Sequence, residues 1–278
     1  MIRTVAICGV GLIGGSFGLA MRKAGFDGEI LGVSSAQTVQ DATSVGAIDR
    51  GASLEEAIAK ADLIYLAQPI SVILDTLPLL DAAKPTALIT DAGSTKTAIV
   101  DRAVRPQREA QFLGGHPMAG KELRGVLAAE ADLFVGRSYF LTPALPGEEN
   151  SAAALEFREW LEKINCRVHL ASPAEHDRTV AYTSHLPQLA STALAGLIDA
   201  SMGVAALPGA GPGLIDMTRL AMSSYDLWAD ILATNSKEVD TALANYIAQL
   251  THIRESLPKD LRNEFKTSSN FAKSLRNR

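Results

Sequence analysis

The stretch VAICGVGLIGGSFGLAMRKA, residues 5–24, decides the fold of this chain. It opens with a short apolar run, Val5–Cys8, and passes through a glycine-rich turn, Gly9–Gly14, into a segment with helical spacing. The turn matches G-x-G-x-x-G, which is typical of dinucleotide-binding folds when it joins a strand to a helix. The structural alternative is a glycine turn in an α/β protein that binds no nucleotide.

Each glycine of the G-x-G-x-x-G pattern has its own physical reason. Gly9 allows the tight turn, Gly11 lets the backbone approach a pyrophosphate, and Gly14 lets helix and strand pack closely. The helix then begins with Leu12 and Ile13. The amino-terminal end of a helix offers unpaired N–H groups and the positive end of the helix dipole to phosphates. The turn therefore predicts a site for NAD or NADP.

The residues after the next two strand-like runs bear on which nucleotide binds. A strand predicted over Glu29–Val33 is followed by Ser34 and Ser35, where NAD-binding folds carry an acidic residue for the ribose 2′-hydroxyl. No carboxylate stands there to repel a 2′-phosphate, although the arginine that often accompanies NADP is also missing. The pattern favours NADP, with NAD as the alternative. Gln68 and Pro69 follow a third strand-like run and are expected to complete the cofactor site.

Two types of organisation follow each other along the chain. Up to residue 172, short strand-like and helix-like segments alternate, which predicts a Rossmann-type, mostly parallel sheet covered on both faces. Residues 173–278 contain long Ala- and Leu-rich helical segments without strand-like runs between them: Ala174–Ala200, Asp216–Ala233 and Ser236–Ser256. We therefore expect a dinucleotide-binding domain over 1–172 and an all-helical substrate-binding domain over 173–278, which also forms a homodimer interface.

Composition excludes some classes of protein. The 278 residues are 47% hydrophobic and 21% charged, and a net charge of −5 without a basic stripe argues against a dedicated nucleic-acid binder. Cys8 and Cys166 show no metal or redox spacing, so reduced thiols and no metal site are expected. The uncharged stretch Thr4–Met21 is interrupted by glycines, which does not fit a signal peptide. We expect no other stretch to span a bilayer. These features predict a cytoplasmic protein with no membrane partner.

A second constellation surrounds His116. The sequence GGHPMAG, Gly114–Gly120, follows a strand-like run, so this loop should lie at the carboxyl edge of the sheet, where ligands bind in such folds. A lone histidine is more often structural than catalytic. Here glycine and proline fix the backbone around it, and a second histidine motif, Ser184–Pro187, follows.

With these motifs in view, the chain resembles the prephenate/arogenate dehydrogenase family of tyrosine biosynthesis. The matching segments occur in the family's order and span almost the whole chain: Gly9–Ser16, Asp91–Lys96, Gly114–Gly120, Ala131–Phe134, Tyr139–Pro143, Ser184–Pro187 and Thr218–Ala221.

The resemblance implies the oxidative decarboxylation of a cyclohexadienol, in which hydride passes to the nicotinamide, carbon dioxide leaves and the ring becomes aromatic. His116 fits the hydrogen-bond acceptor for the hydroxyl proton, because neutral imidazole accepts well near pH 7. Ser94 is expected to hydrogen-bond the same hydroxyl, and Arg219 to pair with a substrate carboxylate. His185 is expected to line the pocket. The alternative for Arg219 is a surface arginine without a ligand, and the alternative for His185 is a structural histidine at a helix start.

Three further positions are expected near the end of the substrate that distinguishes prephenate from arogenate. Gln188 stands where the family commonly has a histidine, which favours arogenate by removing a potential cation. Lys121 adds a charge that favours the keto acid prephenate, and Glu122 lies between Lys121 and Arg124.

Two other functions remain open from the sequence. One is a 3-hydroxyacid or imine reductase of similar architecture, and the other is a non-enzymatic redox sensor that binds NAD(P). Neither gives a reason for both histidine motifs.

Overall fold

The computed structural model describes residues 1–104, 111–121 and 123–277. Within these ranges an eight-stranded sheet has the order β3-β2-β1-β4-β5-β6-β7-β8. Neighbouring strands are parallel except β6 and β7, so the predicted mostly parallel sheet is confirmed. In chain order, β1 to β8 are Thr4–Cys8, Glu29–Val33, Arg50–Gly51, Leu63–Leu66, Leu88–Asp91, Gln111–Pro117, Ser138–Pro143 and Arg167–Leu170.

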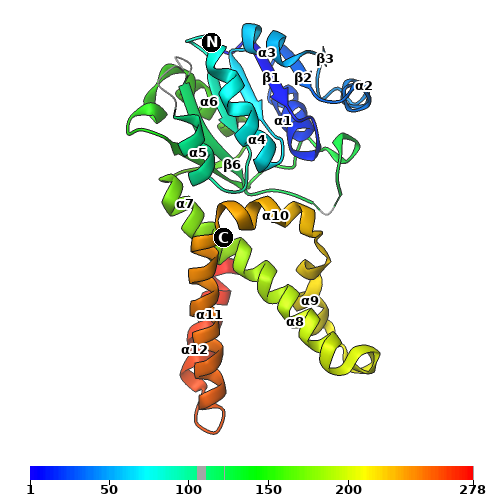
Figure 1. Cartoon of the computed structure of the whole chain (residues 1–278), viewed down its shortest axis with the longest axis vertical. Coiled ribbons are helices and arrows are strands. Elements are labelled where there is room, and N and C mark those ends of the chain that lie inside the picture. Colours follow the sequence, from blue (N-terminus) through cyan, green and yellow to red (C-terminus); the bar gives the residue numbers. More distant parts are fainter. Residues whose placement is uncertain (105–110, 122, 278) are drawn as a thin grey trace.

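Helices cover both faces of this sheet (Figure 1). Because side chains alternate across a strand, Val5 and Ile7 of β1 enter one apolar cluster, while Ala6 and Cys8 enter the other. The first cluster contains Phe17 of α1, whose ring stacks on a strand tyrosine at 4.0 Å between centroids. The covering helices are α1 (Leu12–Lys23), α2 (Ala36–Ser44), α3 (Leu54–Lys60), α4 (Ile70–Thr76), α5 (Thr97–Ala103) and α6 (Ala152–Lys163).

The carboxyl-terminal part is helical, as predicted. Its helices are α7 (Pro173–Val180), α8 (Leu186–Met202), α9 (Pro212–Thr218), α10 (Tyr225–Thr234), α11 (Ser236–Ser256) and α12 (Arg262–Arg276). A capping box starts α7, because Ser172 accepts from the Glu175 backbone and the Glu175 carboxylate accepts from the Ser172 backbone. In Figure 1, α8 and the α11–α12 pair diverge as two arms below the sheet.

Two of the long helices expected from the sequence are interrupted. A π-helical turn, Ala181–His185, separates α7 from α8, and a 3₁₀ turn, Arg219–Met222, follows α9. The second turn ends because Ser223 is extended, and the chain then restarts as α10. Both interruptions carry predicted site residues, so they orient side chains that a straight helix would point elsewhere.

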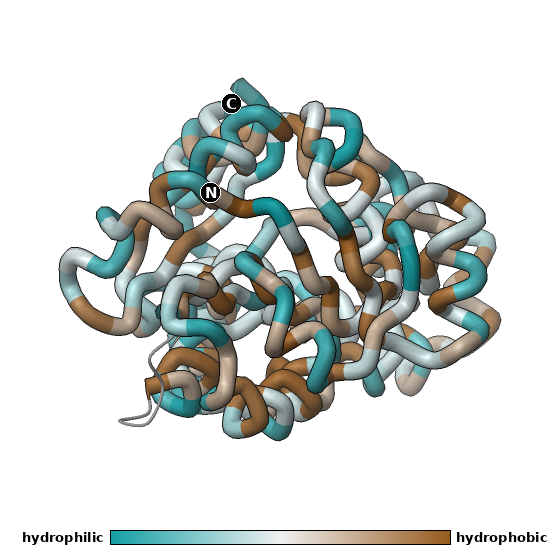
Figure 2. The backbone as a smooth tube through the Cα atoms, turned by 90° about the horizontal axis from the view of Figure 1, so that it is seen from above, coloured by the Kyte–Doolittle hydropathy of each residue, from teal (hydrophilic) through white to brown (hydrophobic). Residues whose placement is uncertain are grey.

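The arms expose apolar surface. In the described part of the chain, the helical segment 173–209 is long and apolar enough to cross a membrane by length and composition, and 6% of its most apolar window is buried. The expectation that no stretch could meet these two criteria was wrong. Apolar residues also lie on outer coils of the chain, seen as brown stretches in Figure 2. Extended exposed apolar faces are typical of interaction surfaces.

Candidate active site

The glycine turn has the geometry that its sequence predicts. Gly9 has a φ of +88°, and a Cβ there would lie 2.8 Å from the carbonyl oxygen of Ala67. A Cβ on Gly14 would overlap the carbonyl oxygen of Gly9, so helix and strand approach too closely for a side chain. A Cβ on Gly11 would meet no protein atom within 4 Å. Packing therefore requires glycine at Gly9 and Gly14, whereas Gly11 leaves backbone N–H groups accessible at the start of α1.

A cavity of about 360 Å³ lies against this turn. Its lining includes Gly9 and Gly11 after β1, Ser34 after β2, and Gln68 and Pro69 after β4. These residues lie together because the carboxyl ends of parallel strands meet at one edge of the sheet. Ser35 caps α2 instead, accepting from the backbone N–H of Thr38 at 3.3 Å. The lining residues are Gly9, Val10, Gly11, Ser34, Thr38, Asp41, Ala67, Gln68, Pro69, Arg124, Gly125, Val126 and Leu127.

Arg124, which we expected near the substrate, lies in the lining of the cavity beside the glycine turn. It shares this lining with Ser34 and Thr38. Its guanidinium also donates to the hydroxyl of Ser224, just before α10, so it links the two parts of the chain. No local sequence signal marks Arg124, because it reaches the cavity from a loop that lies far along the chain from β2.

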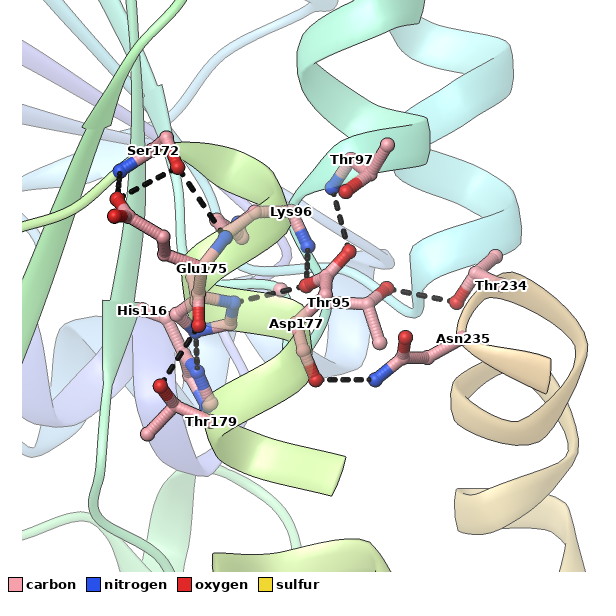
Figure 3. A network of polar contacts seen from close by, with 12 residues as sticks. Thr95, Lys96, Thr97, His116, Ser172, Glu175, Asp177, Thr179, Thr234 and Asn235 are labelled. Carbon is pink, nitrogen blue, oxygen red and sulfur yellow. Dashed lines mark hydrogen bonds and ion pairs between the residues drawn. The ribbon is translucent and has the colours of Figure 1, made fainter. Parts of the chain in front are cut away.

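His116 is the penultimate residue of β6 and is buried, with 8% of its surface exposed. Its Nδ1 lies 2.8 Å from Nε2 of His176 in α7, and Nδ1 of His176 lies 2.9 Å from Oδ1 of Asp177. Figure 3 shows His116 and Asp177 within this polar network. Sequence reasoning overlooked His176 and Asp177; their available signal was a further histidine–carboxylate pair shortly before the Ser184–Pro187 motif.

A buried ion pair fixes the backbone beside His116. Lys96 and Asp91 form this pair, and neither side chain is exposed. The Lys96 ammonium also donates to the carbonyl oxygen of Gly115 at 2.7 Å, while Asp91 accepts from the backbone N–H of Gly115 at 3.1 Å. Both partners thus hold the residue next to His116 against the loop after β5.

Electrostatics keep His116 neutral. Burial, and then the neighbouring His176, Lys96 and His185, hold the pKa of His116 well below its usual value. Burial raises the pKa of Asp177, but hydrogen bonds from His176 and from the start of α5 outweigh it and leave this pKa below its usual value. A neutral imidazole thus stands near a carboxylate at neutral pH.

His185 lies beside this cluster, and Ser94 precedes Lys96 by two residues in the chain. Ser94 is partly buried in the loop between β5 and α5. His185 is 1% exposed, packs edge-on against Trp228 and accepts from the Asn235 amide at 3.3 Å. The same amide donates to the backbone carbonyl of Asp177 at 2.8 Å. His185 and His116 are therefore connected through α7 and the residue that joins α10 to α11.

Gln188 holds the backbone of a nearby turn. Its Nε2 donates to the carbonyl oxygen of Leu220 at 2.8 Å, so it holds the 3₁₀ turn that begins at Arg219. Arg219 itself is exposed on this turn. Gln188 therefore contacts the backbone next to the predicted carboxylate ligand.

Lys121 lies away from the histidine cluster. It forms an ion pair with Glu130 and lines a separate cavity of about 290 Å³ with the Met118–Gly120 backbone. Glu122 lies outside the described residues. The structure thus does not bring Lys121 together with His116.

Two family models match this chain. The prephenate dehydrogenase nucleotide-binding domain matches residues 17–170, and the prephenate dehydrogenase dimerization domain matches residues 172–271. The chain belongs to the prephenate dehydrogenase family. Both the predicted family and the predicted fold class are confirmed.

Individual relatives agree with this family. Prephenate dehydrogenase of Lactococcus lactis subsp. cremoris is 33% identical over 264 residues, covering 93% of this chain and 72% of the relative. The Bacillus subtilis prephenate dehydrogenase is 33% identical over 285 residues, covering 98% and 76%. The prediction of an NAD(P)-linked dehydrogenase, rather than a non-enzymatic sensor, is confirmed.

Solved structures extend the likeness to the whole fold. Synechocystis arogenate dehydrogenase has a TM-score of 0.82 at 29% identity, covering 99% of each chain. A prephenate dehydrogenase from A. aeolicus, in complex with hydroxyphenyl propionate and NAD+, has a TM-score of 0.84 at 27% identity, covering 99% and 96%. A 3-hydroxyisobutyrate dehydrogenase from Mycobacterium tuberculosis has a TM-score of 0.56 at 17% identity, which is a likeness of fold alone.

Proposed function

We propose that this chain catalyses the oxidative decarboxylation of arogenate or prephenate, with His116 as the acceptor of the hydroxyl proton. The observation that carries the proposal is a buried, neutral histidine at the end of β6, on the same sheet edge as the glycine turn. An imidazole with a depressed pKa accepts a proton without first having to lose one.

The glycine turn and its cavity fit a dinucleotide. Gly9 and Gly14 close the turn, and the open side of Gly11 lets the backbone approach a pyrophosphate. When bound, the nicotinamide supplies the acceptor for the hydride that leaves the hydroxyl-bearing carbon. The domain division at 172/173 is part of this proposal, with the nucleotide held by residues 1–172.

The remaining residues orient the substrate. Arg219 pairs with a substrate carboxylate through two parallel N–H groups, and Gln188 holds its turn through the Leu220 carbonyl. Ser94 and His185 contribute hydrogen bonds from two sides. Because aromatisation drives the loss of carbon dioxide, positioning is the main task of these side chains.

NADP is the proposed preferred cofactor. Ser34 and Thr38 offer hydroxyl donors in the cavity, and Arg124 adds the cation that the segment after β2 lacks. Asp41 also lines the cavity and works against a 2′-phosphate, but its carboxylate accepts from the Gln37 amide at 2.9 Å.

Arogenate is the proposed preferred substrate. Gln188 is neutral and engaged with a backbone carbonyl, so it offers no cation to the side chain that distinguishes the two substrates. Lys121, the residue that favoured prephenate, is paired with Glu130. Both observations weaken selection for the keto acid.

A homodimer through the helical arms is the proposed assembly. Large apolar side chains on these arms are exposed, among them Leu197, Met202, Val204 and Leu207. Burying such residues against a second copy removes apolar area from water. Light scattering that shows a monomer at micromolar concentration would contradict this assembly.

A cytoplasmic location is supported by two buried, free cysteines.

One assay tests the reaction and both specificities. Purified protein is given NAD or NADP with arogenate or prephenate, and the absorbance of the reduced nicotinamide is followed. His116→Asn should lower kcat by roughly two to four orders of magnitude and leave cofactor binding intact. His169→Asn, at an exposed histidine of β8, is the matched control. No turnover of either substrate by folded wild-type protein, or near-normal turnover by His116→Asn, would overturn the proposal.

A further inference from the structure

The side chains of His116, His176 and Asp177 form a hydrogen-bonded row. The Asp177 carboxylate can only accept a hydrogen bond, and this fixes where the protons of the two histidines lie. Asp177 carries a carboxylate, so Nδ1 of His176, 2.9 Å away, must hold the proton of that hydrogen bond. In a neutral His176, Nε2 then has the lone pair. Nδ1 of His116 lies 2.8 Å from this Nε2 and must donate to its lone pair. Nε2 of His116 is left as the unprotonated nitrogen.

The direction of this chain depends on a neutral His176. If His176 were charged, its Nε2 would donate to His116 and push the proton of His116 onto Nε2. Burial chiefly lowers the pKa of His176, and nearby Lys96 adds to this, against the opposing carboxylates of Asp177 and Asp91. Among the described residues, these groups and His185, which lies close to His116, are the ones that shift the pKa values of the pair.

Asp177 cannot turn away from His176. Its Oδ1 also accepts from the backbone N–H of Lys96 at 2.7 Å, and its Oδ2 accepts from the backbone N–H of Thr97 at 2.8 Å. Its own carbonyl accepts from Asn235 at 2.8 Å. Figure 3 shows the carboxylate held between these groups. The loop that carries Ser94 and the start of α11 therefore set the direction of the hydrogen bonds that link Asp177, His176 and His116.

We infer that His176 and Asp177 are positioning residues that fix His116 in the tautomer with a free Nε2. The inference rests on the proposed role of His116 as proton acceptor. The substrate O–H bond breaks and the His116 Nε2–H bond forms, while the protons between His116, His176 and Asp177 stay where they are. The resulting imidazolium is stabilised by its hydrogen bond to His176, which in turn points to the Asp177 carboxylate.

Two variants of His176 separate a positioning role from a structural one. His176→Phe keeps a ring of similar shape beside Phe140, which His176 contacts edge-on, but removes the acceptor. His176→Gln keeps an oxygen that can accept from His116 and an amide that can donate to Asp177. The exposed histidine of β8 provides the matched controls, His169→Phe and His169→Gln.

The expected result is a split between the two variants. His176→Phe should lower kcat about 100-fold, with the substrate KM and cofactor affinity little changed, whereas His176→Gln should recover most of kcat. Nitrogen NMR of the histidine side chains should show the His116 proton on Nδ1 in the wild type and in His176→Gln. In His176→Phe it should show a mixture of tautomers.

Several outcomes would overturn the inference. They are wild-type kcat in folded His176→Phe, an equal loss of kcat in folded His176→Gln, or a wild-type His116 that carries its proton on Nε2. The wild-type spectrum decides the matter even if His176→Phe does not fold. Failure of the proposed function gives a different pattern, because His116→Asn would then remain active.

Discussion

Acid should destabilise this protein through His185 in a predictable way. The side chain is 1% exposed, and burial lowers its pKa to about 4, against the opposing charge of Asp177. In the unfolded chain the same imidazole titrates near its ordinary value of about 6.5. Between these two values the unfolded state binds more protons than the folded state. Stability is therefore complete above the unfolded pKa and is lost as the pH falls toward the folded pKa.

The size of the effect follows from the two pKa values. A difference of about 2.5 units means that His185 alone removes about 2 kcal/mol of the free energy of unfolding at about pH 5, and about 3 kcal/mol near pH 4. Replacing His185 by glutamine removes this titration. The substitution also changes the contacts with Trp228 and Asn235, but that change adds a constant that does not vary over this pH range.

The assay is urea unfolding at about pH 7.5 and about pH 5, followed by tryptophan fluorescence. Wild type and His185→Gln are compared at one protein concentration, because association would shift the apparent stability. The free energy lost on acidification should be smaller in the variant by about 2 kcal/mol. Equal losses in wild type and His185→Gln would refute the reasoning.

Two further predictions concern the ligands. Arg124→Gln should weaken NADP binding about 10- to 100-fold, because one charge-assisted hydrogen bond is lost. NAD binding should be nearly unchanged. Equal effects on both nucleotides, measured by fluorescence titration, would exclude Arg124 from 2′-phosphate recognition. Arg219→Ala should raise the KM of the cyclohexadienyl substrate more than it lowers kcat, because its carboxylate partner is present in ground and transition states alike; steady-state kinetics with an unchanged KM would contradict that role.

Local patterns were sufficient for the fold and the family. The glycine turn and the alternation of short apolar runs with helical segments predict a parallel sheet, because strand and helix periods are properties of neighbouring residues. The same holds for the carboxyl-terminal helices, although the turns at Ala181–His185 and Arg219–Met222 were missed. These turns depend on contacts such as that between Gln188 and the Leu220 carbonyl, which no local period encodes.

The sequence by itself therefore determined the glycine turn at Gly9, the sheet that follows from it and the place of His116 at the carboxyl edge of that sheet. Only the tertiary structure decided what surrounds these features. It brings His176 of α7 against His116 of β6 and carries Arg124 to the cavity beside Ser34. The physical reason is that parallel strands gather their carboxyl ends at one edge, so residues far apart in the chain become neighbours through the connections that lead there.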